Sequence, residues 1–521
     1  MQTLESLVLG RAVRGDAAPV QLFNPTTEEA VAEIRSGGID FRAVLEHART
    51  VGGPALRALT FAQRGAALKA LSAAIHAERE ALIEISILNA GTPRGDAKFD
   101  IDGATGTLAY YGALGESLGD RRVLTDGEGT QLGRTPRFFG QHVLVPRLGV
   151  AVHVNAFNFP AWNMMEKAAC ALLAGVPVVE KPGSATAMLA ARIARIVHDS
   201  GILPAGAFQF VAGSLGDLFD HLDAQDAIAF TGSSRTAAIV RGHRNVVAKN
   251  VRVNLEADSL NAAVLASDVD ASSETYGLFL TNVALDMTQK TGQKCTAVRR
   301  ILVPKERVDE VRADLVAQLG KVKLGDPSAP DTRVGPLASK AQFDDVRAGI
   351  ARLAAASDTA CGGAEPARPK GYFLAPTLLV ARDANAAIFH ADEVFGPVAS
   401  LLAYSGSAAE ATALVGRGGG GLVASAYSNS AEWIDEIVVG LAPWHGRLWL
   451  ASDRMAEQSL PPGMVLPASI HGGPGRAGGG EELGGLRGLA FYQQRTALQG
   501  FKSHVAAYGP AEASPVGGAK A

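Results

Sequence analysis

The stretch GVAVHVNAFNFPAWNMMEKAACALLAGVPVVEKPGS, residues 149–184, contains the pattern that decides the fold. Two short β-rich runs, GVAVHV and GVPVVE, enclose a segment with the apolar periodicity of a helix. When a helix joins two parallel strands of one sheet, the crossover is almost always right-handed. Residues 149–184 therefore predict a strand–helix–strand unit of a parallel sheet.

The same alternation continues from this unit to about Ser267. A second helical segment, SATAMLAARIARIVHDSG, stops at Gly201, and Pro204 lies just beyond it. Strands that alternate with helices in this way predict an α/β fold with a doubly wound parallel sheet. We expect the alanine-rich helical region 41–115 to pack against that sheet. The further β-rich runs are AFQFV, AIAF, VRVNL and AAVLA.

A second α/β alternation begins near Glu274 and predicts another domain. It contains the β-rich runs RILVP, FLAPTLLV and ASLLAYS and the helical segment KERVDEVRADLVAQLGKV. The glycine-rich segment HGGPGRAGGGEELGG, residues 471–485, follows it. RFFGQHVLVPRLG alternates apolar and polar residues, as a long protruding strand does, and AFYQQRTALQG could pair with it. Exposed strands of this kind often pair with another chain, so we expect at least a homodimer.

Composition describes an ordinary globular chain and excludes several classes of function. Of 521 residues, 47% are apolar and 19% are charged, and the net charge is −3, so no basic field for nucleic acid is present. The N-terminus lacks the cationic region of a secretory signal, and no apolar run approaches the ~18 residues of a membrane span. The three cysteines are widely separated, which disfavours disulfides and metal-binding motifs and favours the cytoplasm.

The three cysteines have different surroundings in the sequence. Cys170 lies among alanines and leucines and is expected in the core, whereas Cys361, in DTACGG, is expected in a turn. Cys295 lies in the polar, glycine-hinged loop KTGQKCTAVRR, which suits a nucleophile because only a thiolate attacks. A cysteine hydrolase would need a histidine base, and none of the eleven histidines lies in a recognisable partner motif. Glu256 and Glu393 are better candidates, although a glutamate at a strand end is commonly a solvated surface residue.

Seven motifs in order give this chain a specific resemblance. With them the chain resembles the aldehyde dehydrogenase superfamily over nearly its full length. The motifs are NAFNFPAWN (155–163), VVEKPGSAT (178–186), FTGSS (230–234), NLEADS (254–259), GQKC (292–295), EVFGPV (393–398) and EELGG (481–485).

The resemblance implies roles for four catalytic residues. Cys295 would attack the aldehyde carbonyl, and the amide of Asn158 with the Cys295 backbone N–H would hold the oxyanion. Glu256 would be the general base that activates water against the resulting thioester. Glu482 matches a second glutamate near the active site, to which a role in proton relay is attributed.

The resemblance also implies the cofactor-binding residues. Glu393 and Phe395 match the pair that holds the nicotinamide ribose and ring, and Phe157 and Gly213 are expected to contact the cofactor as well. Lys181 follows a strand at the carboxyl edge of the sheet, where such sheets bind ligands. Thr231, Gly232 and Ser233 form a small-residue turn before a helix, which offers free N–H groups to a pyrophosphate.

One position favours NADP over NAD. NAD-preferring members usually have an acidic residue three positions after the motif lysine, where it hydrogen-bonds the ribose. Here that position is Ser184, which leaves room for a 2′-phosphate, and Lys181 supplies a positive charge. NADP is therefore the expected cofactor, with NAD possible, and no metal is expected.

The resemblance implies a division of the chain into domains. The dinucleotide-binding domain is expected over 1–128 and 148–258, and the catalytic domain, with Cys295, over 259–475. Residues 129–147 and 490–505 are expected to be oligomerisation strands, and 506–521 a flexible tail.

Several stretches resemble one branch in particular, which oxidises semialdehydes carried on a coenzyme A thioester during aerobic degradation of aromatic compounds. They are GVAVHVNAFNFPAW, EADSLNAAVL, TGQKCTAVRRI and HGGPGRAGGGEELGGLRG. The chain stops soon after AFYQQRTALQG, which favours the stand-alone type over bifunctional relatives with a hydratase domain. Two departures from the commonest pattern leave the catalytic groups in place: Phe157 stands for a tryptophan, and Asp258–Ser259 stand for glycines. The alternatives are a dehydrogenase of a free aliphatic or aromatic aldehyde, a CoA-acylating enzyme, a thiol hydrolase and a non-catalytic relative.

Overall fold

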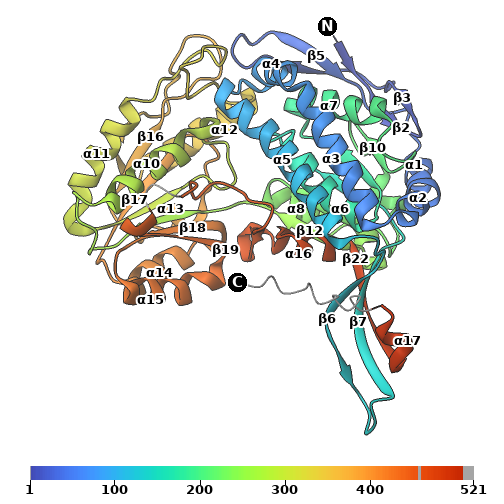
Figure 1. Ribbon diagram of the computed structural model, residues 1–521. Helices are drawn as coiled ribbons and strands as arrows, with labels where there is room; N and C mark the ends of the chain where they lie inside the picture. Colours follow the sequence, from blue (N-terminus) through green and yellow to red (C-terminus); the bar gives the residue numbers. More distant parts are fainter. Residues whose placement is uncertain (1, 456–458, 509–521) are drawn as a thin grey trace, which may run out of the picture.

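Two seven-stranded sheets organise the chain, as the two alternations of strands and helices predict. The computed structural model describes residues 2–455 and 459–508 (Figure 1). The first sheet has the order β12-β11-β8-β9-β10-β2-β3, with five parallel strands and an antiparallel pair at one edge. Its strands are β2 (Ser6–Val8), β3 (Arg11–Val13), β8 (Ala151–Val154), β9 (Val178–Lys181), β10 (Phe208–Phe210), β11 (Ala227–Thr231) and β12 (Arg252–Glu256).

The helices predicted around this sheet are confirmed. α6 (Trp162–Ala174) and α7 (Ala187–Ser200) end at Gly175 and Gly201, whose φ angles of 91° and 62° lie in the left-handed region that glycine tolerates. Four helices of region 41–115 share one buried apolar core with α6, α7 and the sheet: α2 (Gly53–Ala58), α3 (Phe61–Ala77), α4 (Arg79–Ala90) and α5 (Arg94–Leu118). The first helix of the region, α1 (Phe41–His47), packs in a separate core with strands of the same sheet.

The second sheet has the order β15-β16-β17-β14-β13-β18-β19, and all of its strands except the edge strand β15 are parallel. Its strands are β13 (Ala262–Leu265), β14 (Arg300–Pro304), β15 (Ser357–Cys361), β16 (Thr377–Ala381), β17 (Val398–Tyr404), β18 (Gly421–Tyr427) and β19 (His445–Ala451). Helices cover both faces (Figure 1). The longer ones are α10 (Glu274–Thr288), α11 (Val308–Gly320), α12 (Lys340–Ala354), α14 (Ala408–Gly416) and α15 (Ala431–Leu441).

Two details of the predicted sheets are wrong. The run AAVLA was expected to continue the first alternation, but it forms β13 in the second sheet, between β14 and β18. An apolar run buried on both faces fits either sheet, so its composition does not reveal its partners. Cys361 was expected in a turn, but it is the last residue of β15, opposite Leu378.

A three-stranded antiparallel arm projects from the body of the molecule (Figure 1). It consists of β6 (Leu124–Gln131), β7 (Phe138–Pro146) and β22 (Gln493–Phe501). β22 pairs with β7 along its whole length, from Gln493 opposite Pro146 to Phe501 opposite Phe138. The strands predicted within 129–147 and 490–505 thus lie side by side. The predicted tail lies, from residue 509 onward, outside the described residues; before it comes α17 (Lys502–Ala506).

None of the helices in the described part of the chain combines the length and the apolar character needed to cross a membrane.

Candidate active site

The loop that carries Cys295 is fixed by close backbone contacts. It follows a short turn, η4 (Gln289–Gly292), in which Gly292 has φ 68°. A Cβ on Gly292 would lie 2.2 Å from the carbonyl oxygen of Gly396, so only glycine allows this approach. The Asn261 side chain donates hydrogen bonds to the carbonyls of Cys295 and Ala297, at 2.7 and 2.9 Å. Cys295 therefore has a defined position against the second sheet.

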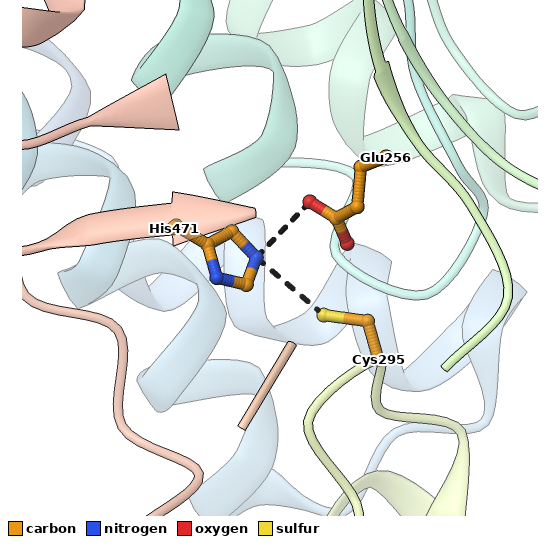
Figure 2. A group of neighbouring side chains, drawn as sticks. All are labelled: Glu256, Cys295 and His471. Carbon is orange, nitrogen blue, oxygen red and sulfur yellow. Dashed lines mark hydrogen bonds and ion pairs between the residues drawn. The ribbon is translucent and has the colours of Figure 1, made fainter. Parts of the chain in front are cut away.

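Three reactive side chains meet at this point (Figure 2). Glu256 is the last residue of β12, and His471 lies in β20 (Ile470–Gly473). His471 Nε2 lies 3.0 Å from Glu256 Oε2 and 3.8 Å from Cys295 Sγ. The Glu256 and His471 side chains are almost completely buried, whereas Cys295 is partly accessible. The structure thus brings together two groups that the sequence predicts and one histidine that it does not.

Charge interactions set the protonation of these groups. Burial alone would raise the pKa of Glu256, but His471 outweighs it and lowers this pKa to about 2. Burial would lower the pKa of His471, yet the Glu256 carboxylate raises it. Burial and the same carboxylate raise the pKa of the Cys295 thiol well above its ordinary value. These shifts favour an ionised carboxylate on Glu256, a protonated imidazole on His471 and a neutral thiol on Cys295.

The same three side chains offer a possible metal-binding set. Their ligand atoms lie within 4.8 Å of one another, and Zn²⁺ accepts sulfur, nitrogen and carboxylate oxygen together. The ion pair between Glu256 and His471, with the neutral thiol of Cys295 beside it, explains why these three side chains lie together even without a metal. A chelator is therefore the appropriate addition to any assay of this site.

A second group of buried charges lies behind the first. Lys167, in α6, lies 3.3 Å from Glu166 and 3.2 Å from Glu482 of β21 (Gly480–Leu483). Burial raises the pKa of Glu166 to about 7, so it can bind or release a proton near neutrality. Glu482 is opposite His471 in the antiparallel β20–β21 pair. Glu482 is thus connected to the site indirectly, by its ion pair with Lys167 and by the pairing of β21 with β20.

A cavity of about 690 Å³ extends from Cys295 along the carboxyl ends of β8, β11 and β12. It has the size of a small-molecule or cofactor site. Ten of the thirteen predicted site residues line it: Phe157, Asn158, Ser184, Thr231, Gly232, Ser233, Glu256, Cys295, Glu393 and Phe395.

Four buried polar atoms on the cavity wall lack a hydrogen-bond partner among the described residues. They belong to Asn155 (Oδ1), Asn158 (Oδ1), Thr231 (Oγ1) and Glu393 (Oε1). The other carboxylate oxygen of Glu393 accepts a hydrogen bond from the Ser259 backbone at 2.8 Å, and burial raises the pKa of this residue to about 7. Buried polar atoms in native proteins nearly always have partners. These orphaned atoms therefore fit a polar ligand such as a dinucleotide.

The three remaining predicted residues do not line this cavity. Lys181, the last residue of β9, points its Nζ to within 3.3 Å of Ser184 Oγ, which does line it. Gly213 follows β10, and a Cβ there would lie 2.6 Å from Ser36 Oγ, so it packs against the N-terminal segment. Glu482 lies in the charged group around Lys167.

A small space of about 20 Å³ lies on the other side of Cys295. Its wall is aromatic: the rings of Phe99 and Trp162 have centroids 5.1 Å apart, and Phe159 lies beside both. Glu166 and His471 also border it. Cys295 therefore borders two spaces, the large cavity and this small, aromatic-walled one, which has about the size of a water molecule.

Sequence reasoning missed His471, Glu166 and Lys167. His471 is the first residue of the glycine-rich segment 471–485, which was noticed but gave no role to the histidine. Glu166 and Lys167 are two charges inside an otherwise apolar helix, where every residue of α6 is buried. Charged residues are almost never fully buried unless they are paired, so this pattern was the available signal.

The chain is similar to several known proteins. A model of the aldehyde dehydrogenase family matches residues 13–463. A protein of Aromatoleum evansii named 3,4-dehydroadipyl-CoA semialdehyde dehydrogenase is 44% identical over 479 residues, which cover 90% of this chain and 93% of that protein. An NAD-dependent aldehyde dehydrogenase from Sinorhizobium meliloti has a similar structure, with a TM-score of 0.83, 24% identity and coverage of 96% and 95%. An NADP-dependent enzyme of E. coli gives a TM-score of 0.84 with 23% identity and coverage of 96% and 98%.

Proposed function

The chain belongs to the aldehyde dehydrogenase family, and we propose that it oxidises a semialdehyde carried on a coenzyme A thioester to the carboxylic acid, with NADP as its cofactor. The name of the relative from Aromatoleum evansii supports 3,4-dehydroadipyl-CoA semialdehyde as the substrate. The resemblance of the sequence motifs is the ground for a place in aerobic benzoyl-CoA degradation. Oxidation of a free aliphatic or aromatic aldehyde is the alternative.

In the first half-reaction the Cys295 S–H bond breaks, its proton passes to the Glu256 carboxylate, and sulfur bonds to the aldehyde carbon. The carbonyl oxygen becomes an oxyanion, which Asn158 and the Cys295 backbone N–H would stabilise. One such hydrogen-bond donor typically lowers the free energy of the transition state by about 3 kcal/mol. When bound, the nicotinamide ring supplies the hydride acceptor, and Glu393 and Phe395 would hold it beside Cys295.

In the second half-reaction Glu256 takes a proton from water, and the resulting hydroxide attacks the thioester carbon. The C–S bond breaks, the acid is released, and Cys295 regains a proton. The group formed by Glu166, Lys167 and Glu482 can carry the surplus proton away from Glu256. The buried, ionised Glu256 beside Cys295 is the observation that best supports hydrolysis by water over transfer to coenzyme A.

Steady-state assays with two substrates test the proposal. kcat/KM for 3,4-dehydroadipyl-CoA semialdehyde should exceed that for the free semialdehyde acid by about 100-fold, because the coenzyme A portion contributes binding energy. Each substrate is assayed with NADP and with NAD. Equal kcat/KM for both substrates would favour the free-aldehyde alternative.

The Ser184→Glu substitution tests the proposed cofactor preference. Ser184 lies on the cavity wall within reach of Lys181 Nζ, so a glutamate there would bring a carboxylate next to the 2′-phosphate and compete for the lysine. The KM for NADP should rise about tenfold or more, while the KM for NAD changes little. Ser184→Gln, similar in size but neutral, is the matched control. Higher kcat/KM with NAD in the wild type would contradict the NADP assignment.

We propose that the arm formed by β6, β7 and β22 joins two copies of the chain. Phe138 and Phe501 lie opposite each other on the arm and are 46% and 54% exposed, an apolar surface that a second subunit could cover. Sedimentation at micromolar concentration should give at least a dimer. Phe138→Asp with Phe501→Asp should shift it towards monomer, and a wild type found only as monomer would rule the interface out.

A further inference from the structure

One nitrogen of His471 faces both groups between which the first proton must move. Nε2 lies 3.0 Å from Glu256 Oε2 and 3.8 Å from Cys295 Sγ (Figure 2). We propose that His471 is a further catalytic residue, whose positively charged Nε2–H stabilises negative charge on Glu256 in the resting enzyme and on Cys295 once the thiol has lost its proton. This inference rests on the proposed function, since it assigns a role in that reaction.

Within the described part of the chain, the other cations near the site are engaged elsewhere, so His471 is the one placed to stabilise the negative charge on Glu256 and Cys295. Lys167 also acts on Glu256, but it contacts Glu166 and Glu482. Lys294 acts on Cys295, but it pairs with Asp286 at 2.6 Å. Arg447 of β19 donates to the Pro462 carbonyl at 2.9 Å and faces His471 only as a more distant positive charge. Among the described residues, the only ion pair of Glu256 is the one with His471. Without His471, the thiol would have to ionise beside a buried carboxylate that has no direct counter-charge.

The proposed proton transfer moves the negative charge from Glu256 to Cys295, and that charge stays beside the cation of His471 throughout. The S–H electron pair stays on Sγ, the proton bonds to a Glu256 oxygen, and the negative charge passes from oxygen to sulfur. Nε2 is already near both atoms, so the imidazolium need not move far. When water later cleaves the thioester, the leaving group is the same thiolate, and the same cation stabilises it. A fixed charge of this kind acts without reorganisation, which is why it is effective in a buried site.

The backbone around His471 holds the ring in this position. β20 pairs with β21, and Gly472, the residue after His471, has φ 141°. A Cβ on Gly472 would lie 2.0 Å from the Gly480 carbonyl, and one on Gly446 would lie 2.0 Å from the Gly472 carbonyl. Side chains are therefore excluded on both sides of the strand. This close packing explains the glycines after His471 in the sequence.

The test measures the reactivity of Cys295 without any aldehyde. The rate of iodoacetamide labelling of the Cys295 peptide is followed by mass spectrometry from pH 6 to 10, with a chelator present, in wild type and in His471→Gln. Glutamine keeps a donor near Nε2 but has no charge. Labelling of His471→Gln at neutral pH should be about 10- to 100-fold slower, and its profile should move to higher pH, because each unit of thiol pKa is tenfold in thiolate.

His445→Gln is the matched control. His445 is a buried histidine of β19 whose pKa is lowered to about 4 by burial, so it is neutral in the working range. This variant should label at the wild-type rate. If His471→Gln does not fold, His471→Asn serves the same purpose.

The outcomes separate the two proposals. A folded His471 variant with an unchanged labelling profile would overturn the role of His471, even if its dehydrogenase activity were low. Slower labelling in the variant, together with a wild type that oxidises no aldehyde, would support the charge role of His471 and overturn the proposed function instead.

Discussion

Cys295→Ala is expected to bind NADP with nearly the wild-type Kd and to reduce almost none of it when aldehyde is added. Removal of a nucleophile that acts in a coupled set lowers kcat by about 10⁴-fold or more. Cys295 is one of many residues that line the 690 Å³ cavity, and the predicted cofactor residues on its wall remain intact in this variant. Fluorescence titration measures the affinity, and NADPH absorbance measures turnover.

The control is Cys361→Ala. Cys361 is also partly exposed, but it lies at the end of β15, where its Sγ donates a hydrogen bond to the Pro376 carbonyl at 3.7 Å. This variant should keep the wild-type kcat. Turnover of Cys295→Ala within about tenfold of wild type would rule out covalent catalysis by this residue, because a missing nucleophile costs far more.

Local patterns in the sequence were sufficient for most of the fold. The helices before Gly175 and Gly201 end where the glycines indicate, because a left-handed residue is a local requirement. β8 and β9 follow from the alternation around them, since a helical connection enforces parallel strands. The strand pattern alone did not predict the sheet membership of β13, although the domain boundary at residue 259 implied by the resemblance puts it with the later strands. Ala262–Leu265 is buried on both faces, and only pairing with β14 and β18, distant in sequence, decides where it lies.

The site residues also differ in whether local sequence or long-range packing determines their position. Cys295, Glu256 and Asn158 were found because each lies in a recognisable motif, and all three line one cavity. His471 lies 176 residues from Cys295, in a segment whose glycines could as well have formed a plain loop. Its position depends on how β20 and β21 pack against β12 and β19, which is a property of the assembled sheets. Sequence patterns reflect requirements between residues that are near one another in the chain. The contact between His471 and Cys295 joins residues far apart in the chain, so no such pattern indicates it.

Glu256→Gln is expected to reduce one equivalent of NADP per active site and then to stop, with the acyl group still on Cys295. The first half-reaction survives because His471 loses the carboxylate that raises its pKa, becomes neutral, and can itself take the thiol proton across the 3.8 Å contact. The second half-reaction fails because glutamine cannot accept a proton from water. Removal of a general base typically lowers the rate of its step by about 10²- to 10⁴-fold.

Rapid mixing with excess aldehyde measures the burst and the steady rate that follows, and intact-protein mass spectrometry detects the acyl-enzyme. Hydroxylamine is the control, since a strong nucleophile cleaves a thioester without a general base and should restart NADP reduction. Glu256→Gln combined with His471→Gln should lose the burst as well, because neither proton acceptor remains. A folded Glu256→Gln variant without a burst would show that the carboxylate itself must deprotonate Cys295 and that His471 cannot replace it.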